Sequence, residues 1–393
     1  MAANQQKLSP DLAILATIFP DIPVLAHRVV SNTFDTCTFF ATLSEAEKPA
    51  EVVVRLEKSR TSRLPAVAAL QELARTRMSH LVPSTIKVGK AKTEDGTEVD
   101  FSVTEYYPDT VTLESVWNDL DHEQRVSIMQ AVVDAISQLQ DVRLVSTDDQ
   151  VKHILEGTSF LDDSHQIVAS VGGPGLGYFG SFTALLTNIV KPADPDQAPY
   201  TFTTGDDGSL TLESSYPDFK TVTVAKDQLD ELNKSCVLCH NDIEPRNLLV
   251  RLTDSGYKLA AIIDWEMAGF IPFSLETGLK DTFLGMQNLY FSFYALYKKL
   301  TAHLVRATSS GSDDAQLQLI EAVRLAKLSK QRSMTHQVGA QVQRKWLERE
   351  KVELTSDVRG GWVRLDGVDD VGPFTEEDKN AIEQEVLKEL GYI

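Results

Sequence analysis

One polar stretch of the chain, His240-Asn-Asp-Ile-Glu-Pro-Arg-Asn247, carries residue types that can do chemistry together. Asn247 and the later residue Asp264 offer an amide oxygen and a carboxylate, which are hard ligands that suit Mg²⁺. Such an ion keeps few protein ligands and fills its remaining positions with water and phosphate. Asp242 could orient an attacking hydroxyl and accept its proton. These residue types therefore fit phosphoryl transfer.

Two short apolar segments must position these groups. Leu248–Leu252 and Tyr257–Ile263 read as strands, and the Asp-Ser-Gly tripeptide between them is a turn signal. A hairpin closed at that turn brings Asn247 beside Ile262–Asp264 at its open end. The sequence therefore predicts two oxygen ligands at one end of a β-ribbon.

The spacing of these residues also carries a family resemblance. His240-x-Asp242-x-x-x-x-Asn247, with an aspartate after a later strand, is the pattern of the protein-kinase-like fold. With Ile263–Gly269 it resembles the aminoglycoside phosphotransferase family, especially its fungal members, and its His-Asn-Asp start is similar to choline and ethanolamine kinases. Thr104–Tyr107 and Leu113–Trp117 look more weakly like the family's inter-lobe linker and the following helix, so the resemblance covers about residues 50 to 280.

The resemblance implies a role for each residue of the catalytic segments. Asp242 would be the catalytic base, and Asn247 and Asp264 would hold Mg²⁺. His240 would support the catalytic loop by bonding to the backbone near the metal-binding segment.

The resemblance also implies contacts to the nucleotide and the acceptor. The linker backbone at Glu105, Tyr106 and Tyr107 would bond the base of ATP or GTP. Arg246 and Glu266 would meet the substrate, although a solvated surface charge explains either residue equally well.

The small lobe departs from the family pattern where phosphate should bind. The family has a lysine on a strand, and Val52–Leu56 offers Arg55 instead. Arginine can bind phosphate bidentately, but it is bulkier and not interchangeable with lysine. Ala66 takes the place of the helix glutamate that orients the lysine, Glu72 is the nearest acid, and Val30–Asp35 has no glycine where the family has a glycine-rich loop.

These departures leave three interpretations open. The protein is an active ATP- or GTP- and Mg²⁺-dependent phosphotransferase for a small-molecule hydroxyl, a pseudokinase that binds or regulates, or an enzyme whose cleft serves another reaction. The complete set of Asp242, Asn247 and Asp264 favours activity. Arg55 would then contact the nucleotide phosphates; the alternative is a surface arginine at the end of a strand.

The expected fold class is α+β with two protein-kinase-like lobes. Residues 1–105 would form a small lobe with an antiparallel sheet, and 106–393 a larger, mainly helical lobe with the catalytic loop 240–247 and the metal-binding segment 262–269. Strands are expected near 51–56, 85–92 and 99–106, and helices over 67–76 and 113–139. Asp141–Leu229 reads as rich in loops.

Composition limits the partners. The 393 residues include 38 Lys and Arg against 57 Asp and Glu, a formal net charge of −19. This excess argues against nucleic-acid binding and favours a small-molecule acceptor that is itself cationic. No apolar run is long enough to span a bilayer, no signal peptide precedes Pro10, and three cysteines exclude a disulfide scaffold, so we expect a cytoplasmic protein without a membrane partner.

Two further motifs carry less weight. Cys236-Val-Leu-Cys-His240 matches a haem-attachment pattern and could supply zinc ligands, but a buried strand with two reduced thiols explains it better. Gly175-Leu-Gly-Tyr-Phe-Gly180 matches a dinucleotide-binding fingerprint, yet no series of βαβ units surrounds it. We interpret the second motif as a loop insertion that shapes the substrate side.

Overall fold

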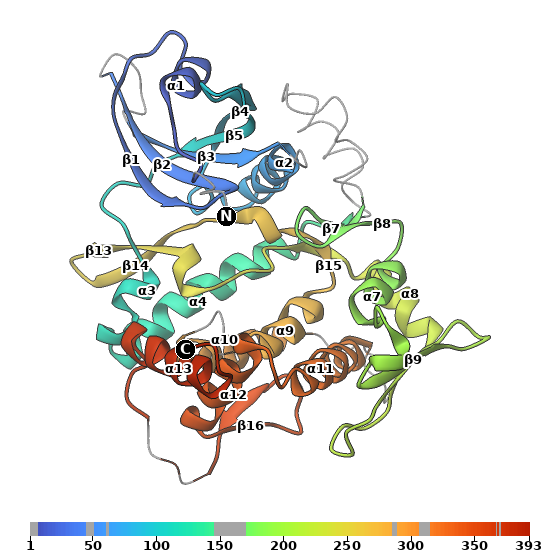
Figure 1. Cartoon of the computed structure of the whole chain (residues 1–393). Coiled ribbons are helices and arrows are strands. Elements are labelled where there is room, and N and C mark those ends of the chain that lie inside the picture. The colour runs from blue at the N-terminus through green and yellow to red at the C-terminus, as the bar shows by residue number, and fades with distance from the viewer. Residues whose placement is uncertain are drawn as a thin grey trace.

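We describe a computed structural model of the chain. It describes residues 7–44, 51–59, 63–144, 170–284, 289–305, 315–366, 368 and 371–393. A small β-sheet with two helices stands above a larger part made mostly of helices, and the hairpin β13–β14 lies between them (Figure 1). The predicted α+β, two-lobed fold is confirmed, whereas the exact boundary near residue 105 stays a prediction.

The upper part is built on one antiparallel sheet of five strands in the order β1-β2-β3-β5-β4. Burial alternates along β2 and β3, as expected of strands with one face on a core. The predicted strands near 51–56, 85–92 and 99–106 are confirmed. The strands are β1 (Val24–Asn32), β2 (Thr36–Leu43), β3 (Glu51–Lys58), β4 (Thr85–Lys92) and β5 (Glu98–Glu105).

Two helices accompany this sheet and serve different cores. Helix α1 (Leu12–Ile18) adds Ile14 to the apolar face of the sheet. Helix α2 (Leu64–Arg75) begins with a proline in its first turn, where a missing N–H costs nothing, and buries Leu70 and other residues in the main core of the larger part. Helix α2 therefore packs between the sheet and the rest of the molecule.

The predicted helix over 113–139 is interrupted in the structure. Helix α3 (Leu113–Val116) is followed by a 3₁₀ turn and then by α4 (His122–Leu139). The carboxylate of Asp121 accepts a hydrogen bond from the Gln124 backbone N–H at 2.8 Å. This N-cap starts a new helix and accounts for the interruption.

The region predicted as loop-rich holds more regular structure than expected. Three strands, β9 (Tyr200–Thr204), β10 (Leu210–Ser214) and β11 (Val222–Val224), form an antiparallel sheet that packs on α11. Leu210 and Leu212 are buried on alternate positions of β10. This period of two was hidden by the many threonines of the segment. Residues 145–169 of that region lie outside the described residues.

The glycine-rich segment forms a hairpin, with β7 (Val171–Gly173) and β8 (Gly177–Phe179) in a sheet with β12 (Val237–Cys239) and β15 (Gly269–Ile271). A Cβ on Gly173 would lie 2.1 Å from the Ala268 carbonyl oxygen, and one on Gly269 would lie 2.3 Å from that of Gly172. These glycines thus allow two strands to approach closely.

The remaining elements form the helical base and its short sheets. The last helix begins with a capping box at Thr375, whose hydroxyl accepts from the Asp378 N–H while the Asp378 carboxylate accepts from the Thr375 N–H. No helix among the described residues is long and apolar enough to cross a membrane. These elements are α7 (Phe182–Val190), α8 (Lys226–Lys234), β13 (Leu248–Thr253), β14 (Gly256–Ile262), α9 (Phe273–Thr282), α10 (Phe291–Thr301), α11 (Ala315–Ser333), α12 (Val338–Glu350), β16 (Val352–Leu354), β17 (Trp362–Arg364) and α13 (Glu376–Glu389).

Candidate active site

The hairpin β13–β14 joins the two polar segments, as the sequence predicted. Leu248 pairs with Ile262 at its open end, and the Ile263 backbone N–H donates to the Asn247 carbonyl oxygen at 2.9 Å. Asn247 and Asp264 consequently lie at the same end of the ribbon. A bulge after Leu249 shifts the register by one residue without separating them.

Asp242 is held by its own loop. The Asn247 side-chain N–H₂ donates to the Asp242 carboxylate at 2.8 Å and to its backbone carbonyl at 2.9 Å. Arg246 donates one guanidinium nitrogen to both carboxylate oxygens, at 3.1 and 3.0 Å. Arg246 is therefore paired with Asp242, and the Asp242 carboxylate has a fixed orientation.

His240 is buried beneath the loop and connects it to the second segment. Its Nδ1 accepts from the Asp242 backbone N–H at 3.3 Å, and its Nε2 faces the Ile263 carbonyl oxygen at 3.0 Å. This pair of contacts requires a neutral ring with the proton on Nε2. Burial lowers the pKa of His240 to about 4, so the ring is neutral at pH 7. The ring also packs edge-on against Trp265.

Asp264 has the left-handed backbone conformation, with φ of 64°, which is uncommon outside glycine. Burial raises the pKa of its carboxyl group, and the nearby Arg55 opposes that rise. The Arg55 Nη1 lies 3.7 Å from the Asp264 Oδ1. Asn241, in the catalytic loop, is also left-handed, so both polar segments contain a strained residue.

Arg55 belongs to a network of two arginines and two glutamates. Its Nε donates to Glu57 at 2.9 Å, and its Nη2 donates to Glu266 at 2.5 Å. Arg63, at the start of α2, donates twice to Glu57, at 2.8 and 2.9 Å, and once to Glu266 at 3.1 Å. Glu266 therefore joins the segment after Asp264 to the upper part of the molecule.

Glu57 and Arg63 are functional candidates that the sequence reasoning missed. Glu57 stands two residues after Arg55 on β3, and a strand places such residues on the same face. That period was a usable signal. The Arg63 contact had no comparable signal, because it depends on how α2 meets β3 in space.

The helix that could have supplied a glutamate to Arg55 does not do so. The carboxylate of Glu72 accepts instead from the Thr85 backbone N–H at 2.7 Å, and Ala66 is buried. The acids facing Arg55 come from its own strand, as Glu57, and from the segment that holds Asp264 and Glu266. Arg55 therefore belongs to a four-residue network and is not paired with a glutamate of α2.

The turn between β1 and β2 likewise has no glycine-rich phosphate loop. The Thr33 backbone N–H donates to the Thr36 carbonyl at 2.8 Å, and the Thr33 hydroxyl accepts from the Asp35 and Thr36 N–H groups. The Thr33 side chain thus closes this turn, whose sequence contains no glycine.

Of the linker residues, Glu105 ends β5, and Tyr106 and Tyr107 lie between β5 and β6 (Val111–Thr112). Glu105 bonds to Ser84 through its backbone N–H, at 3.0 Å, and through its side chain. The Tyr106 ring lies edge-on to Phe40, and the Tyr107 carbonyl accepts from the Thr110 hydroxyl at 2.8 Å. Burial raises the pKa of Tyr107.

Helix α9 supports the catalytic loop with two buried charges that the sequence reasoning did not select. The Glu276 carboxylate accepts from the Asn241 backbone N–H and from the Tyr297 hydroxyl, each at 3.0 Å. One turn later, the Lys280 ammonium donates to the Ile243 carbonyl at 2.5 Å and to Glu244 at 2.7 Å. The shape of the loop thus depends on α9.

The two cysteines before His240 are buried and unbridged; Cys239 ends β12, and Cys236 directly precedes that strand. Burial raises the pKa of Cys236 to about 12 and holds that of Cys239 well above its usual value, so both are neutral thiols. The described residues contain no group of three or more His, Cys, Asp or Glu side chains that could hold a metal ion. The interpretation as a buried strand with reduced thiols is confirmed.

Solved structures align with most of the chain at low similarity. The GDP complex of wild-type aminoglycoside 2'-phosphotransferase-IIIa is 13% identical with a TM-score of 0.39, and the alignment covers 96% of this chain and 95% of that one. The GDP and kanamycin complex of APH(2")-IIia is 12% identical with a TM-score of 0.38, and the alignment covers 96% of this chain and 97% of that one. Aminoglycoside-3'-phosphotransferase of type VIII is 15% identical with a TM-score of 0.38, and the alignment covers 79% of this chain and 96% of that one.

The family assignment does not depend on those alignments, whose TM-scores are too low to carry an argument. No curated protein matches the chain. The model of the phosphotransferase enzyme family (APH) matches residues 28–278, which is more than half of the sequence. The match includes Arg55, the catalytic loop and Asp264, so the chain belongs to the APH phosphotransferase enzyme family.

Proposed function

We propose that the protein transfers the terminal phosphoryl group of ATP or GTP to a hydroxyl of a small molecule. One observation carries the proposal: the hydrogen bond from Ile263 to Asn247 sets two oxygen ligands beside the fixed carboxylate of Asp242. A metal clamp next to a positioned base is what phosphoryl transfer requires.

The donor set fits a magnesium ion. Asn247 uses its amide nitrogen on Asp242, so its amide oxygen is the atom that can bind a cation. Asp264 supplies a carboxylate, and two protein oxygens with phosphate and water are typical of Mg²⁺. When bound, the ion neutralises charge that develops on the phosphates. Asn247 and Asp264 are the residues that would hold it.

The remaining residues position the reacting groups. Asp242, fixed by Arg246 and Asn247, orients the acceptor hydroxyl and accepts its proton. Arg55 would exchange part of its contact with Glu266 for a phosphate oxygen, because a guanidinium binds carboxylate and phosphate with the same geometry. His240 would keep the loop and the metal segment together.

The linker at Glu105, Tyr106 and Tyr107 would bond the base of the nucleotide, as the family resemblance implies. The acceptor is a small molecule with a hydroxyl group, and the net charge of −19 favours one that is cationic. A cytoplasmic location is part of the same proposal.

The pseudokinase alternative has one supporting observation, since Arg55 is occupied by three carboxylates. Calorimetry with ATP and GTP, with and without Mg²⁺, combined with detection of released diphosphate, separates the two. Mg²⁺-dependent binding with release of ADP or GDP in the presence of hydroxyl acceptors supports the phosphotransferase. Binding without release supports the alternative, and turnover without diphosphate release supports a different reaction.

A further inference from the structure

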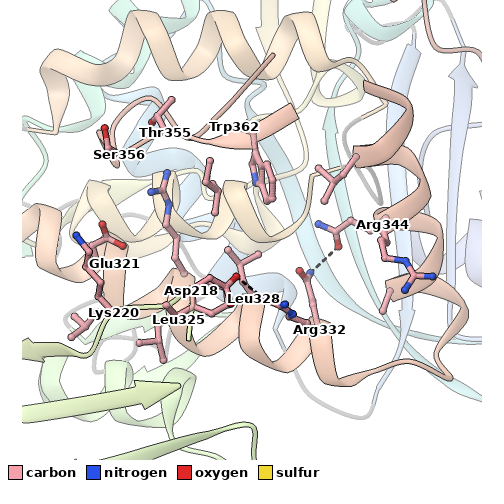
Figure 2. Close-up of a pocket in the computed structure, with 18 of the residues that line it drawn as sticks. Asp218, Lys220, Glu321, Leu325, Leu328, Arg332, Arg344, Thr355, Ser356 and Trp362 are labelled. Atoms are coloured by element: carbon pink, nitrogen blue, oxygen red, sulfur yellow. Dashed lines mark hydrogen bonds and ion pairs between the residues drawn. The ribbon is translucent and has the colours of Figure 1, made fainter. Parts of the chain in front are cut away.

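A cavity of about 1010 Å³ lies in the helical part of the molecule (Figure 2). It is formed by one face of α11, by α12, by the segment that leads into β11 and by the loop between β16 and β17. Cavities that hold small organic molecules have volumes of roughly 300 to 1,000 Å³. The volume thus suits a ligand of that size.

This cavity is separate from the candidate active site. On α9, Glu276 and Lys280 contact the catalytic loop, whereas Ser274 bonds to Gln316 of α11 at 2.5 Å. Gly278 of α9 also lies against Ile320 of α11. Helix α9 therefore stands between the catalytic loop and α11, and none of the residues assigned to phosphoryl transfer lines the cavity.

The charge of the lining differs from that of the chain. Four cationic residues face two anionic ones there, whereas the whole chain has 38 cationic against 57 anionic residues. The cationic residues are Lys220, Arg324, Arg332 and Arg344, and the anionic residues are Asp218 and Glu321. Cations thus outnumber anions among the lining residues, which favours an anionic ligand.

The cations are not equivalent. Arg324 is buried and bonds to Asp281 at 2.7 Å, and Arg332 is paired with Asp218 at 2.6 Å. Arg344 has a longer ion pair with Glu348 at 3.8 Å, and because the pairs of Arg332 and Arg344 are both exposed, each is worth little in water. Arg332 and Arg344 lie toward one end of the cavity, while Lys220 and Glu321 lie toward the other (Figure 2). The end with Arg344 is the place for an anionic group.

The floor between these ends is apolar. Leu325 and Leu328 of α11 are buried, and the Trp362 ring lies across from them (Figure 2). Leu347 of α12 completes this floor. An aromatic or aliphatic body fits such a surface, whereas a sugar or a free phosphate leaves it uncovered.

We propose that this cavity is a second ligand site, which binds a small organic anion with an apolar body and a carboxylate or sulfonate group. The anionic group meets Arg344 and Arg332, and the apolar body lies on Leu325, Leu328 and Trp362. The proposal does not depend on phosphotransfer, because it uses none of the residues of that reaction.

The test uses fluorescence titration of the full chain with anilinonaphthalene sulfonate, and with the uncharged phenylnaphthylamine as the matched probe. We expect saturable one-to-one binding of the sulfonate that persists with saturating Mg²⁺ and ATP. Arg344→Gln should weaken sulfonate binding about threefold and Arg332→Gln/Arg344→Gln about tenfold, with no change for the uncharged probe. Lys299→Gln, which removes an exposed lysine of α10 outside the cavity, should change neither affinity.

Ala340→Trp gives a second, independent arm, since residue 340 lines the cavity and the larger ring fills it. We expect it to abolish binding of both probes while circular dichroism stays unchanged. The proposal is overturned if the arginine variants bind the sulfonate as the wild type does, or if nucleotide displaces the probe. A folded Ala340→Trp variant that binds normally overturns it equally.

Discussion

Arg55 of β3 and Glu266, two residues after Asp264, face each other with Nη2 and Oε2 2.5 Å apart. This contact links the sheet of the upper part to the segment that ends the β13–β14 hairpin. Arg63 shares the same carboxylate oxygen of Glu266, and Glu57 binds both arginines. The position that we propose for phosphate binding is thus occupied by an ion-pair network whose members are less than one-third exposed.

Removal of the Arg55 guanidinium tests its assignment to the nucleotide phosphates. Arg55→Ala should lower the affinity for Mg²⁺-bound ATP or GTP roughly 10- to 100-fold, because a charge-assisted hydrogen bond contributes about 1.5–3 kcal/mol. Lys90→Ala, at an exposed position of β4, is the matched control and should leave the affinity unchanged. Calorimetric titration gives both values, and equal affinities for wild type and Arg55→Ala contradict the assignment.

Glu266 has two competing roles that one variant separates. As a partner of Arg55 it controls the nucleotide contact, so Glu266→Gln should change the dissociation constant of the nucleotide and leave the KM of the acceptor within about twofold. As a contact to the acceptor, Glu266 should affect the KM of the acceptor, and Glu266→Gln should leave the dissociation constant of the nucleotide unchanged. Steady-state kinetics with each substrate varied in turn decides between them, and a raised acceptor KM alone would reject the network role.

The buried pair of Lys280 and Glu244 should control the stability of the catalytic loop. Lys280→Met leaves the Glu244 charge buried without its partner, and we expect a loss of about 3–5 kcal/mol in the free energy of unfolding. Lys280→Met/Glu244→Met removes both charges and should recover most of that loss. Urea unfolding measures all three proteins, and a double variant no more stable than the single one would refute this explanation.

His240 should make stability depend on pH in the acid range. Its folded pKa of about 4 lies below the usual value near 6.5, so the unfolded chain binds the proton first as pH falls. Above about pH 7 the buried neutral ring therefore leaves the free energy of unfolding unchanged. By about pH 5 it lowers the free energy of unfolding by about 2 kcal/mol. Urea unfolding of wild type and His240→Gln should show this loss only in the wild type, and parallel pH profiles would contradict it.

Much of the candidate site could be predicted because its order in the chain is also its order in space. The catalytic loop, the turn and the two strands are contiguous, so hairpin geometry alone places Asn247 beside Asp264. The strand period also gives the face of Arg55.

The rest depends on packing between distant elements. Glu276 and Lys280 look like ordinary charges of a helix, and only the position of α9 beneath the loop gives them partners. Arg63 acquires its role because α2 starts beside β3. The β9–β11 sheet was missed because polar threonines fill its exposed positions, and the cavity beside α11 arises from segments more than 100 residues apart.

The base assigned to Asp242 is tested most directly by phosphoryl transfer from labelled ATP or GTP to a panel of hydroxyl acceptors, cationic ones included. We expect Asp242→Asn to lower transfer at least about 100-fold, the range of general-base catalysis, while the dissociation constant of the Mg²⁺-bound nucleotide changes less than about threefold. Undiminished transfer by the variant, or nucleotide binding by a wild type that transfers to no acceptor, would contradict the account.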